Sequence, residues 1–169
     1  MNQGIFSEND IEKDIIRPMC EADVDRMAVL EKLCFRTPWS RASIAGELKN
    51  KAAHYLVCER AGEVIGYAGM WVIMDEAHIT NVAVDPLHRR EGLGRRIMLC
   101  MMRAAALFGA ERMTLEVREN NIPAQTLYLG LGFTKAGERK GYYFDTGEAA
   151  HIMWNNDIAL TLKNHGVII

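Results

Sequence analysis

The apolar positions of this chain recur with two spacings, one typical of helices and the other of strands. Between residues 23 and 35 the spacing is helical, with apolar side chains at Val24, Met27, Ala28, Leu30 and Leu33. Residues 14–19, DIIRPM, predict a strand ahead of that helix. The break RTPWS ends the helix, and Ser40 or Thr37 is expected to cap a second helix over residues 41–49.

The remaining apolar runs predict further strands and two further helices. Strands are expected over residues 54–60, 64–74, 77–84, 112–117, 134–144 and 149–155, with Gly62 in the turn of the first hairpin. Helices are expected from about Gly94 to Phe108, closed by Gly109, and over residues 122–132, capped by Asn120 or Asn121. The order β-α-α-β-β-β-α-β-α-β-β predicts an α/β protein with a mixed sheet and one β-α-β crossover.

Length and composition predict the domain organisation. With 169 residues, 49% of them apolar and 25% charged, the chain is expected to form one domain over residues 1–169, with a core of about 13–155. The extension 156–169, NDIALTLKNHGVII, ends in apolar residues. Such an end is compatible with packing on the domain, with self-association or with a loose tail.

Net charge and the composition of individual segments limit the kinds of partner that this chain is expected to bind. A net charge of −2 argues against a general nucleic-acid binder. The first twelve residues, MNQGIFSENDIE, lack the basic and apolar regions of a secretory signal. No apolar run approaches the ~20 residues that span a bilayer. We therefore expect a cytoplasmic protein whose partner is neither nucleic acid nor a membrane.

The cysteines and histidines lack the spacing of a metal site. Cys20, Cys34, Cys58 and Cys100 are scattered through apolar stretches, which predicts reduced thiols rather than disulfides or zinc ligands. The five histidines contain no H-E-x-x-H pair. The sequence therefore predicts no metal.

The stretch HRREGLGRR, residues 88–96, lies where a predicted strand turns into a predicted helix. Gly92 and Gly94 allow backbone N–H groups to approach an anion, and the helix N-terminus adds about half a positive charge. Arg89, Arg90, Arg95 and Arg96 add full charges. A pyrophosphate fits this description, whereas the alternative is a surface turn with solvated arginines. A dinucleotide fingerprint is disfavoured, because its third glycine position holds Ile97.

Three motifs, in this order along the chain, resemble the GCN5-related N-acetyltransferase (GNAT) family. TPWS precedes the second helix, and RREGLG, residues 89–94, matches the family signature Q/R-x-x-G-x-G/A. LEVRENNIPAQTLYLGLGF, residues 115–133, is similar to the ribosomal-protein alanine N-acetyltransferases, the RimI type. The resemblance runs from Ile15 to Trp154. It implies a mostly antiparallel sheet with splayed central strands and helices on both faces, and it implies acetyl-CoA as co-substrate.

The resemblance also implies where acetyl-CoA binds. The cofactor would lie in the gap between the fourth and fifth strands, with its pyrophosphate on the amides of residues 90–95 and its pantetheine along the edge of residues 81–84. The cofactor-binding residues so implied are Val82, Ala83, Val84, Arg89, Arg90, Gly92, Leu93, Gly94, Arg95, Asn121 and Tyr128. A cap of the following helix is an equally good role for Asn121.

Acetyl transfer needs a neutral amine, a polarised thioester carbonyl and a proton for the leaving thiolate. The resemblance assigns Glu116 as the base and Tyr128 as the acid. Glu116 shares a strand face with Thr114 and Arg118, so the alternative for it is a solvated polar face. The alternative for Tyr128 is a core tyrosine. His78 is a second candidate base, because its ordinary pKa of ~6.5 suits an α-amine.

The resemblance places the acceptor groove between residues 35–40 and residues 142–147. The substrate-binding residues are then Pro38, Trp39, His78, Tyr142 and Tyr143, although Pro38 and Trp39 are equally suited to capping and packing the second helix. Deprotonating an α-amine near neutral pH costs about 1 kcal/mol, against about 4.6 kcal/mol for a lysine.

The sequence therefore favours a protein N-terminus as the acceptor, and the resemblance points to the N-terminal alanine of a ribosomal protein. A lysine side chain or a small amine is the alternative acceptor. A non-catalytic acetyl-CoA-binding module is the alternative function, and it would need neither Glu116 nor Tyr128.

Overall fold

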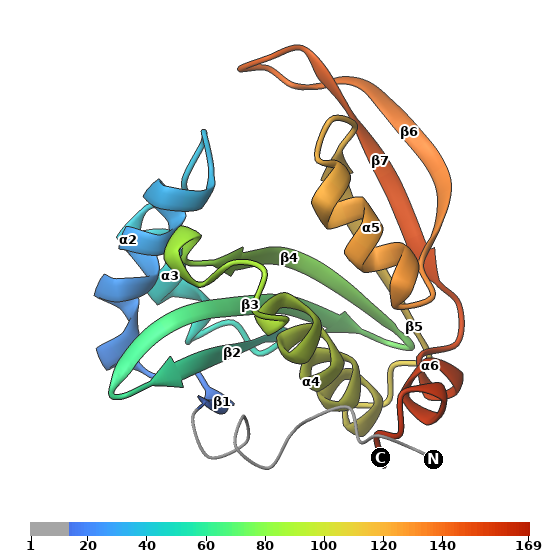
Figure 1. Ribbon diagram of the computed structural model, residues 1–169, viewed down its shortest axis with the longest axis horizontal. Coiled ribbons are helices and arrows are strands. Elements are labelled where there is room, and N and C mark those ends of the chain that lie inside the picture. The colour runs from blue at the N-terminus through green and yellow to red at the C-terminus, as the bar shows by residue number, and fades with distance from the viewer. Residues whose placement is uncertain (1–13) are drawn as a thin grey trace.

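The computed structural model describes residues 14–169, which form one seven-stranded mixed sheet with helices packed on it (Figure 1). In spatial order the strands are β1 (Asp14–Pro18), β2 (Ala53–Arg60), β3 (Glu63–Ile73), β4 (Glu76–Val84), β5 (Arg112–Arg118), β7 (Glu148–Asn155) and β6 (Thr134–Tyr143). Only β4 and β5 are parallel neighbours in this sheet; the other pairs are antiparallel. The predicted α/β class and the mostly antiparallel sheet are confirmed.

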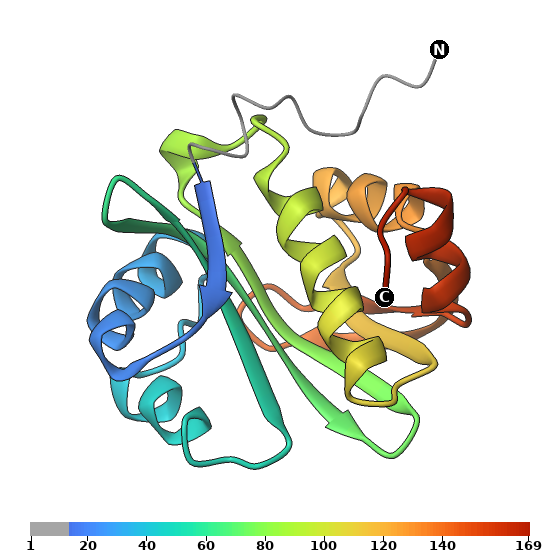
Figure 2. The same cartoon turned by 90° about the horizontal axis from the view of Figure 1, so that it is seen from below.

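The helices cover both faces of the sheet, as predicted (Figure 2). On one face lie the short helix η1 (Glu21–Asp23), α2 (Val24–Cys34) and α3 (Arg41–Glu47). On the other face lie α4 (Leu93–Leu107), α5 (Ile122–Gly130) and α6 (Ile158–Asn164). A second short helix, η2 (Pro86–His88), leads from β4 into the glycine loop. Ser40 rather than Thr37 caps α3, by accepting from the Ser43 N–H at 3.0 Å.

Two hydrophobic clusters hold the layers together, one on each face. On the α4 face, Ile97, Met98 and Met101 are fully buried together with Met113 of β5. On the α2 face, Met27, Leu30 and Ile44 pack against Val57 and Tyr67. At 20–33 cal/mol per Å² of apolar surface, such burial supplies the main favourable free energy of folding.

The sheet opens where β4 and β5 separate. These two strands pair only at Glu76–Arg112, Ala77–Met113 and His78–Thr114. A bulge follows in β4, because Ile79 pairs with Met70 and Asn81 with Gly69, which leaves Thr80 without a β3 partner. From residue 79 to residue 84, β4 has no β5 residue beside it. The predicted splay of the central strands is therefore present.

The structure describes the C-terminal extension of the chain but not its first thirteen residues. The C-terminal extension contains α6, which the apolar pattern did not predict, and its residues Ile158 and Leu162 are buried against the α4 face. The extension packs on the domain, although Ile168 and Ile169 at its end remain exposed. The first twelve residues, for which no secretory signal is expected, and Lys13, where the predicted core begins, lie outside the described residues.

Two further expectations, reduced cysteines and the lack of a bilayer-spanning segment, concern residues 14–169. All four cysteines are free thiols. In the same residues no helix combines the length and the apolar character needed to cross a membrane.

Candidate functional site

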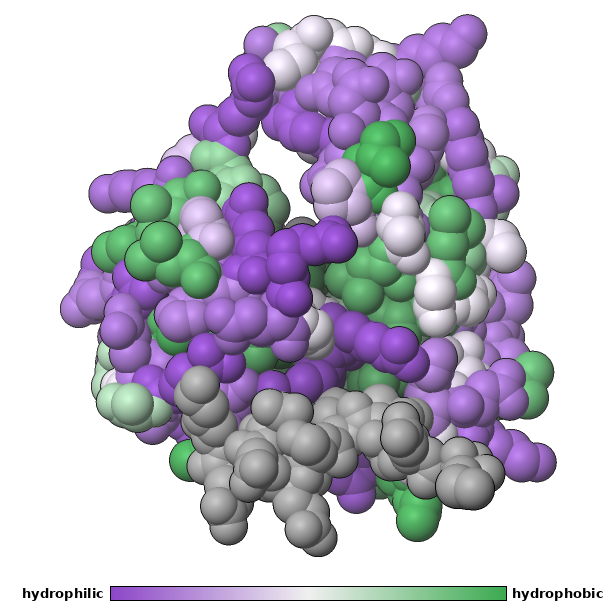
Figure 3. All heavy atoms as spheres, viewed as in Figure 1, coloured by the Kyte–Doolittle hydropathy of each residue, from purple (hydrophilic) through white to green (hydrophobic). Residues whose placement is uncertain are grey.

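A cavity of about 650 Å³ lies at the fork between β4 and β5. It opens between the α2–α3 loop and the β6–β7 hairpin, as the space-filling view shows (Figure 3). Its walls are Trp39, His78, Ile79, Thr80, Thr114, Leu115, Glu116, Arg139, Tyr142, Tyr143, Ile152 and Trp154. The fold thus brings together the predicted base, the second candidate base and the predicted aromatic walls. Pro38 is exposed and lies outside this lining.

Glu116 is held by the middle of β5, where it pairs with Ile152 of β7. Its neighbours Leu115 and Val117 are buried in the α4-face core, so strand alternation turns the Glu116 carboxylate into the cavity. Its side chain is 29% exposed, and Arg139 lies 3.1 Å from its Oε1. A hydrogen bond to Glu116 raises the pKa of the Tyr142 hydroxyl. The carboxylate is therefore neither a core residue nor a freely solvated one.

Arg139 and Trp154 are cavity residues that the sequence did not identify. Arg139 lies on β6, whose neighbour in the sheet is β7, and β7 in turn pairs with β5. Only this strand order brings the Arg139 guanidinium over Glu116 and to 5.6 Å from the centroid of the Tyr142 ring. A basic residue three positions before the predicted aromatic wall was the available signal.

His78 lies on the last residue pair that joins β4 to β5. Its Nε2 is 2.9 Å from Glu76 Oε2, and its ring meets Trp154 edge-on with the ring centroids 6.3 Å apart. An imidazole in this arrangement is oriented by a carboxylate, which is how histidine bases are commonly held. The contact leaves His78 a candidate base beside Glu116.

Tyr128, the predicted acid, is buried in α5 and packs on Phe133 with ring centroids 5.8 Å apart. Burial raises the pKa of the Tyr128 hydroxyl, and nearby Tyr143 raises it further. The residue lies outside the lining of the cavity, so it does not share a wall with Glu116. Its buried ring matches the core-tyrosine alternative, and its role as the acid stays a prediction.

The glycine loop provides the backbone geometry that an anion needs. Gly92 has φ +78° and stands at the N-terminus of α4, where no side chain caps the first-turn N–H groups. Gly94 faces α5 so closely that a Cβ there would lie 3.3 Å from Leu127 Cδ2. The uncapped helix N-terminus and the unpaired edge of β4 offer backbone donors and acceptors to phosphate and amide groups. The residues present therefore fit a phosphorylated cofactor with an amide-containing arm.

The four arginines of the loop differ in their partners. Arg96 is 2.6 Å from Asp14, Arg95 is hydrogen-bonded to His165 at 2.8 Å, and Arg89 donates to the Val84 carbonyl at 3.2 Å. Arg90 has φ +65° and an exposed side chain. Of the four full charges that the sequence places in this loop, that of Arg96 is paired with Asp14.

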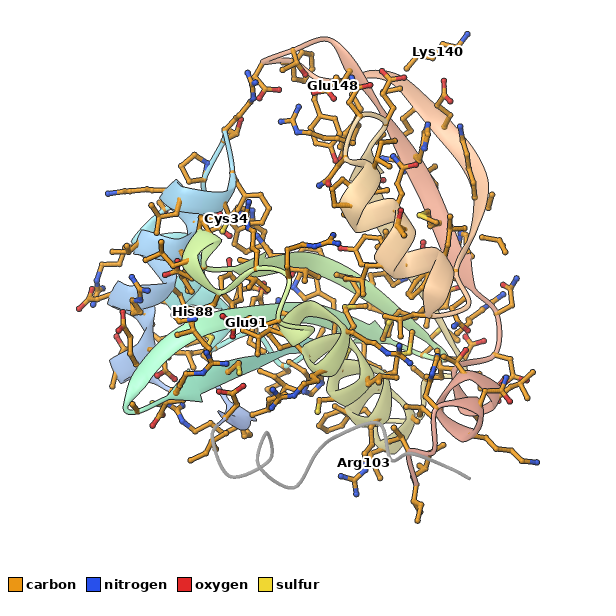
Figure 4. The ribbon with its side chains drawn as sticks, viewed as in Figure 1. Cys34, His88, Glu91, Arg103, Lys140 and Glu148 are labelled. Carbon is orange, nitrogen blue, oxygen red and sulfur yellow. The ribbon has the colours of Figure 1, made fainter. Side chains whose placement is uncertain are left out.

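An ion-pair network, which the sequence did not predict, fastens the glycine loop to the sheet. Arg60 of β2 is 2.6 Å from Asp14 and 2.8 Å from Glu91, and its Nη1 lies 3.2 Å from His88 Nδ1. Figure 4 shows His88 and Glu91 close together in the loop ahead of α4. Arg60 lowers the pKa of both carboxyl groups through its hydrogen bonds.

The other predicted cofactor residues occupy three settings. Val82 and Val84 are half-buried on the open edge of β4, while the side chains of Ala83 and Leu93 are buried in the α2-face and α4-face cores respectively. Asn121 caps α5 by accepting from the Ala124 N–H at 3.2 Å, which is the structural role considered for it.

The sequence profile of the Acetyltransferase (GNAT) family matches residues 24–133, a span that holds the fork, the glycine loop and Glu116. The chain belongs to this family. As a GNAT enzyme it is an acetyl-CoA-dependent N-acetyltransferase.

Individual GNAT relatives cover most of the chain. A Bacillus subtilis protein provisionally assigned as a ribosomal protein bS18-alanine N-acetyltransferase is 42% identical over 84% of this chain and 95% of its own length. The N-alpha-acetyltransferase RimI of Mycobacterium tuberculosis is 32% identical over 85% of this chain and 93% of its own. The crystal structure of the ribosomal-protein-S18-alanine N-acetyltransferase of Escherichia coli superposes with a TM-score of 0.78 at 31% identity, covering 83% of this chain and 92% of that one.

Proposed function

We propose that this enzyme acetylates the N-terminal α-amine of a protein, and that its acceptor is a ribosomal protein that begins with alanine. The observation that carries the proposal is the placement of Glu116 at the base of a cavity walled by Trp39 on one side and by Tyr142 and Tyr143 on the other. Such a groove accommodates the extended end of a chain and directs its first amine toward the carboxylate. The names of the relatives in Bacillus subtilis and Escherichia coli support the same acceptor, which would place the enzyme in the cytoplasm.

We propose that acetyl-CoA is held by the open edge of β4 and the glycine loop. Residues 81–84 pair with the pantetheine arm, and the first-turn amides of α4 together with Arg90 hold the pyrophosphate. When bound, acetyl-CoA supplies the activated acetyl thioester. The ion pairs of Arg60 with Asp14 and Glu91 fix the loop against the sheet, so that this site exists before the cofactor arrives.

Glu116 acts as the base that takes the proton from the acceptor amine. An α-amine needs only about 1 kcal/mol to reach its neutral form near neutral pH, which one partly exposed carboxylate can provide. The Arg139 guanidinium next to Glu116 disfavours a second cation there, so the site prefers the neutral, nucleophilic amine to the ammonium ion. A lysine amine, from its ordinary pKa, would require about 4.6 kcal/mol at the same pH.

Tyr128 acts as the acid that serves the leaving thiolate. A tyrosine hydroxyl is protonated near neutral pH, which is the form a donor needs. The Tyr128 ring extends from α5 and packs on Phe133, so the donor direction is set before the reaction. His78, oriented by Glu76, is the alternative proton acceptor on the β4 side of the cavity.

A peptide panel tests the proposal. The purified protein is incubated with acetyl-CoA and with peptides that have free N-termini and varied first residues, blocked peptides that contain lysine, and small amines. Thiol release gives the rate, and mass spectrometry locates the acetyl group. We expect transfer to free N-termini, fastest when the first residue is alanine. Transfer only to lysine or to small amines would refute the acceptor, and cofactor binding without any transfer would favour the non-catalytic alternative.

A further inference from the structure

A carboxylate that the sequence did not single out lies buried behind the acceptor cavity. Glu31, on α2, has no exposed surface. Its Oε2 accepts a hydrogen bond from the Trp39 backbone N–H at 2.7 Å, and its Oε1 accepts from Asn81 Nδ2 at 2.9 Å and from the Tyr67 hydroxyl. Burial and the adjacent Glu31 raise the pKa of Tyr67, which keeps its hydroxyl a donor.

The partners of Glu31 belong to the two halves of the site. Trp39 forms a wall of the acceptor cavity. Asn81 is the first residue of β4 beyond the bulge at Thr80, where the open cofactor edge begins. One carboxylate therefore contacts both the loop that faces the acceptor and the strand that faces the thioester.

The two contacts are not equally replaceable. Asn81 is also held by the β-ladder, through its register with Gly69 of β3. Within residues 14–169, the Trp39 N–H is the only backbone N–H of loop residues 36–39 that donates a hydrogen bond to another element. Loss of the Glu31 carboxylate should therefore displace the Trp39 wall and leave β4 in place.

Stability alone explains this arrangement poorly. Burying a carboxylate carries a large desolvation cost, and a well-packed apolar side chain is often at least as stabilising. The group formed by Glu31 and its partners also retains an unpaired polar atom, since Asn81 Oδ1 is buried without a hydrogen-bond partner. What a charged acceptor provides here is a strong hydrogen bond, which fixes the direction of the Trp39 N–H.

We propose that Glu31 is a positioning residue for acetyl transfer, which sets the Trp39 wall of the acceptor groove relative to the cofactor edge of β4. The inference rests on the proposed peptide acceptor for its kinetic consequence, but its structural consequence does not. When Glu31 holds the wall, the acceptor amine enters between Trp39 and the β6–β7 hairpin in line with Glu116. When it does not, the groove widens and peptides bind more weakly.

Glu31→Gln tests the kinetic consequence, because it keeps the shape of the side chain and removes one strong acceptor. We expect the KM for an N-terminal alanine peptide to rise about fivefold, as expected from replacing a charge-assisted hydrogen bond by a neutral one, while the KM for acetyl-CoA stays within about twofold. Glu47→Gln is the matched control. Glu47 accepts a hydrogen bond of 2.6 Å from the Trp71 indole and does not line the acceptor cavity. It should leave the peptide KM unchanged. A lower thermal midpoint with both KM values unchanged in Glu31→Gln would show a purely structural role.

Fluorescence separates this inference from the identity of the acceptor. In a Trp71→Phe, Trp154→Phe background, Trp39 is the remaining tryptophan of the chain. Adding Glu31→Gln should raise the acrylamide quenching constant of Trp39 by about twofold, whether or not any peptide is acetylated. An unchanged quenching constant overturns the inference. A raised constant in an enzyme that ignores peptide N-termini would retain Glu31 as the support of Trp39 and refute only the acceptor.

Discussion

Arg139 of β6 lies 3.1 Å from Glu116 of β5, although a third strand, β7, separates the two in the sheet. The pair places a permanent cation beside the proposed base in an enzyme whose acceptor arrives as a cation. The charge state of the acceptor and the position of the hairpin are thus linked through one contact.

Glu116→Gln should lower kcat/KM for the acceptor peptide by about 10²-fold or more, because positioned general bases contribute ~10²–10⁴-fold. Binding of acetyl-CoA should be unchanged, since Glu116 lies on β5 and not on the open edge of β4. Steady-state kinetics and calorimetric binding measure the two quantities. Glu138→Gln, which removes a carboxylate of β6 paired with Lys135, is the control and should keep full activity. Retained transfer in Glu116→Gln would move the base to His78.

Arg139→Gln should shift the acidic limb of the kcat profile to higher pH. Without the guanidinium, a bound ammonium ion becomes more favourable, so a higher pH is needed to reach the neutral, nucleophilic amine. The Arg139 side chain is 56% exposed, so screening limits the shift to about half a pH unit. The profile is recorded from about pH 6 to pH 9. Lys135→Gln, on the same strand, should leave it unchanged, and a downward shift in Arg139→Gln would contradict the proposed role.

Tyr128→Phe should reduce kcat by about 10²-fold and leave the fold intact, because phenylalanine preserves the ring contact with Phe133. Circular dichroism and thiol-release kinetics report the two effects. Tyr55→Phe removes another buried hydroxyl, one bonded to Thr80 Oγ1 at 2.9 Å, and serves to separate loss of a core hydrogen bond from loss of an acid. Equal kcat values for Tyr128→Phe and the unmodified enzyme would leave Tyr128 as a core residue only.

The Asp14 network should make stability depend on acidic pH. Arg60, followed by Arg96, lowers the pKa of Asp14 below its ordinary value, so the native state favours the ionised form. Its contribution to stability is therefore present above about pH 4 and is lost as the pH falls through the lower native pKa. Asp14→Asn should remove this dependence and cost about 3 kcal/mol near neutral pH, because two largely buried guanidiniums lose a shared carboxylate partner.

Urea unfolding at several pH values measures both effects of Asp14→Asn. Asp75→Asn is the control, because its carboxylate is half exposed and pairs with Arg112 at 3.4 Å. That change should alter stability by less than about 1 kcal/mol. Similar stabilities for Asp14→Asn and the unmodified protein would show that the loop anchor carries little free energy.

Gly92→Ala should weaken acetyl-CoA binding and lower stability by about 1 kcal/mol, because a side chain at φ +78° is strained even though the space around it is open. Gly46→Ala is a matched change in a helix with equally open surroundings and ordinary φ. It should be neutral or slightly stabilising and should leave the KM for acetyl-CoA unchanged. An acetyl-CoA KM that also stays constant in Gly92→Ala would contradict the proposed pyrophosphate site.

Local pattern carried a large part of the fold. Helical spacing located α2, and Gly94 and Gly109 marked the two ends of α4 to within about one or two residues, because capping and periodicity act over a few residues. Gly62, together with Ala61, occupies the predicted first hairpin turn in the left-handed region. The C-terminal extension was not predicted to be helical, and α6 forms with Ile158 and Leu162 buried against the α4 face.

For the candidate site too, some features could be predicted from local sequence and others depend on tertiary contacts. The sequence by itself determined the family resemblance, the uncapped glycine loop, the strand that carries Glu116 and the aromatic residues of the groove, because each depends on a contiguous motif. Tertiary structure decided that Arg139 covers Glu116, that Asp14 neutralises Arg96 and that Glu31 holds Trp39. These contacts join residues on separate elements, and their energies depend on burial and distance, which are properties of the folded chain and not of any local stretch of its sequence.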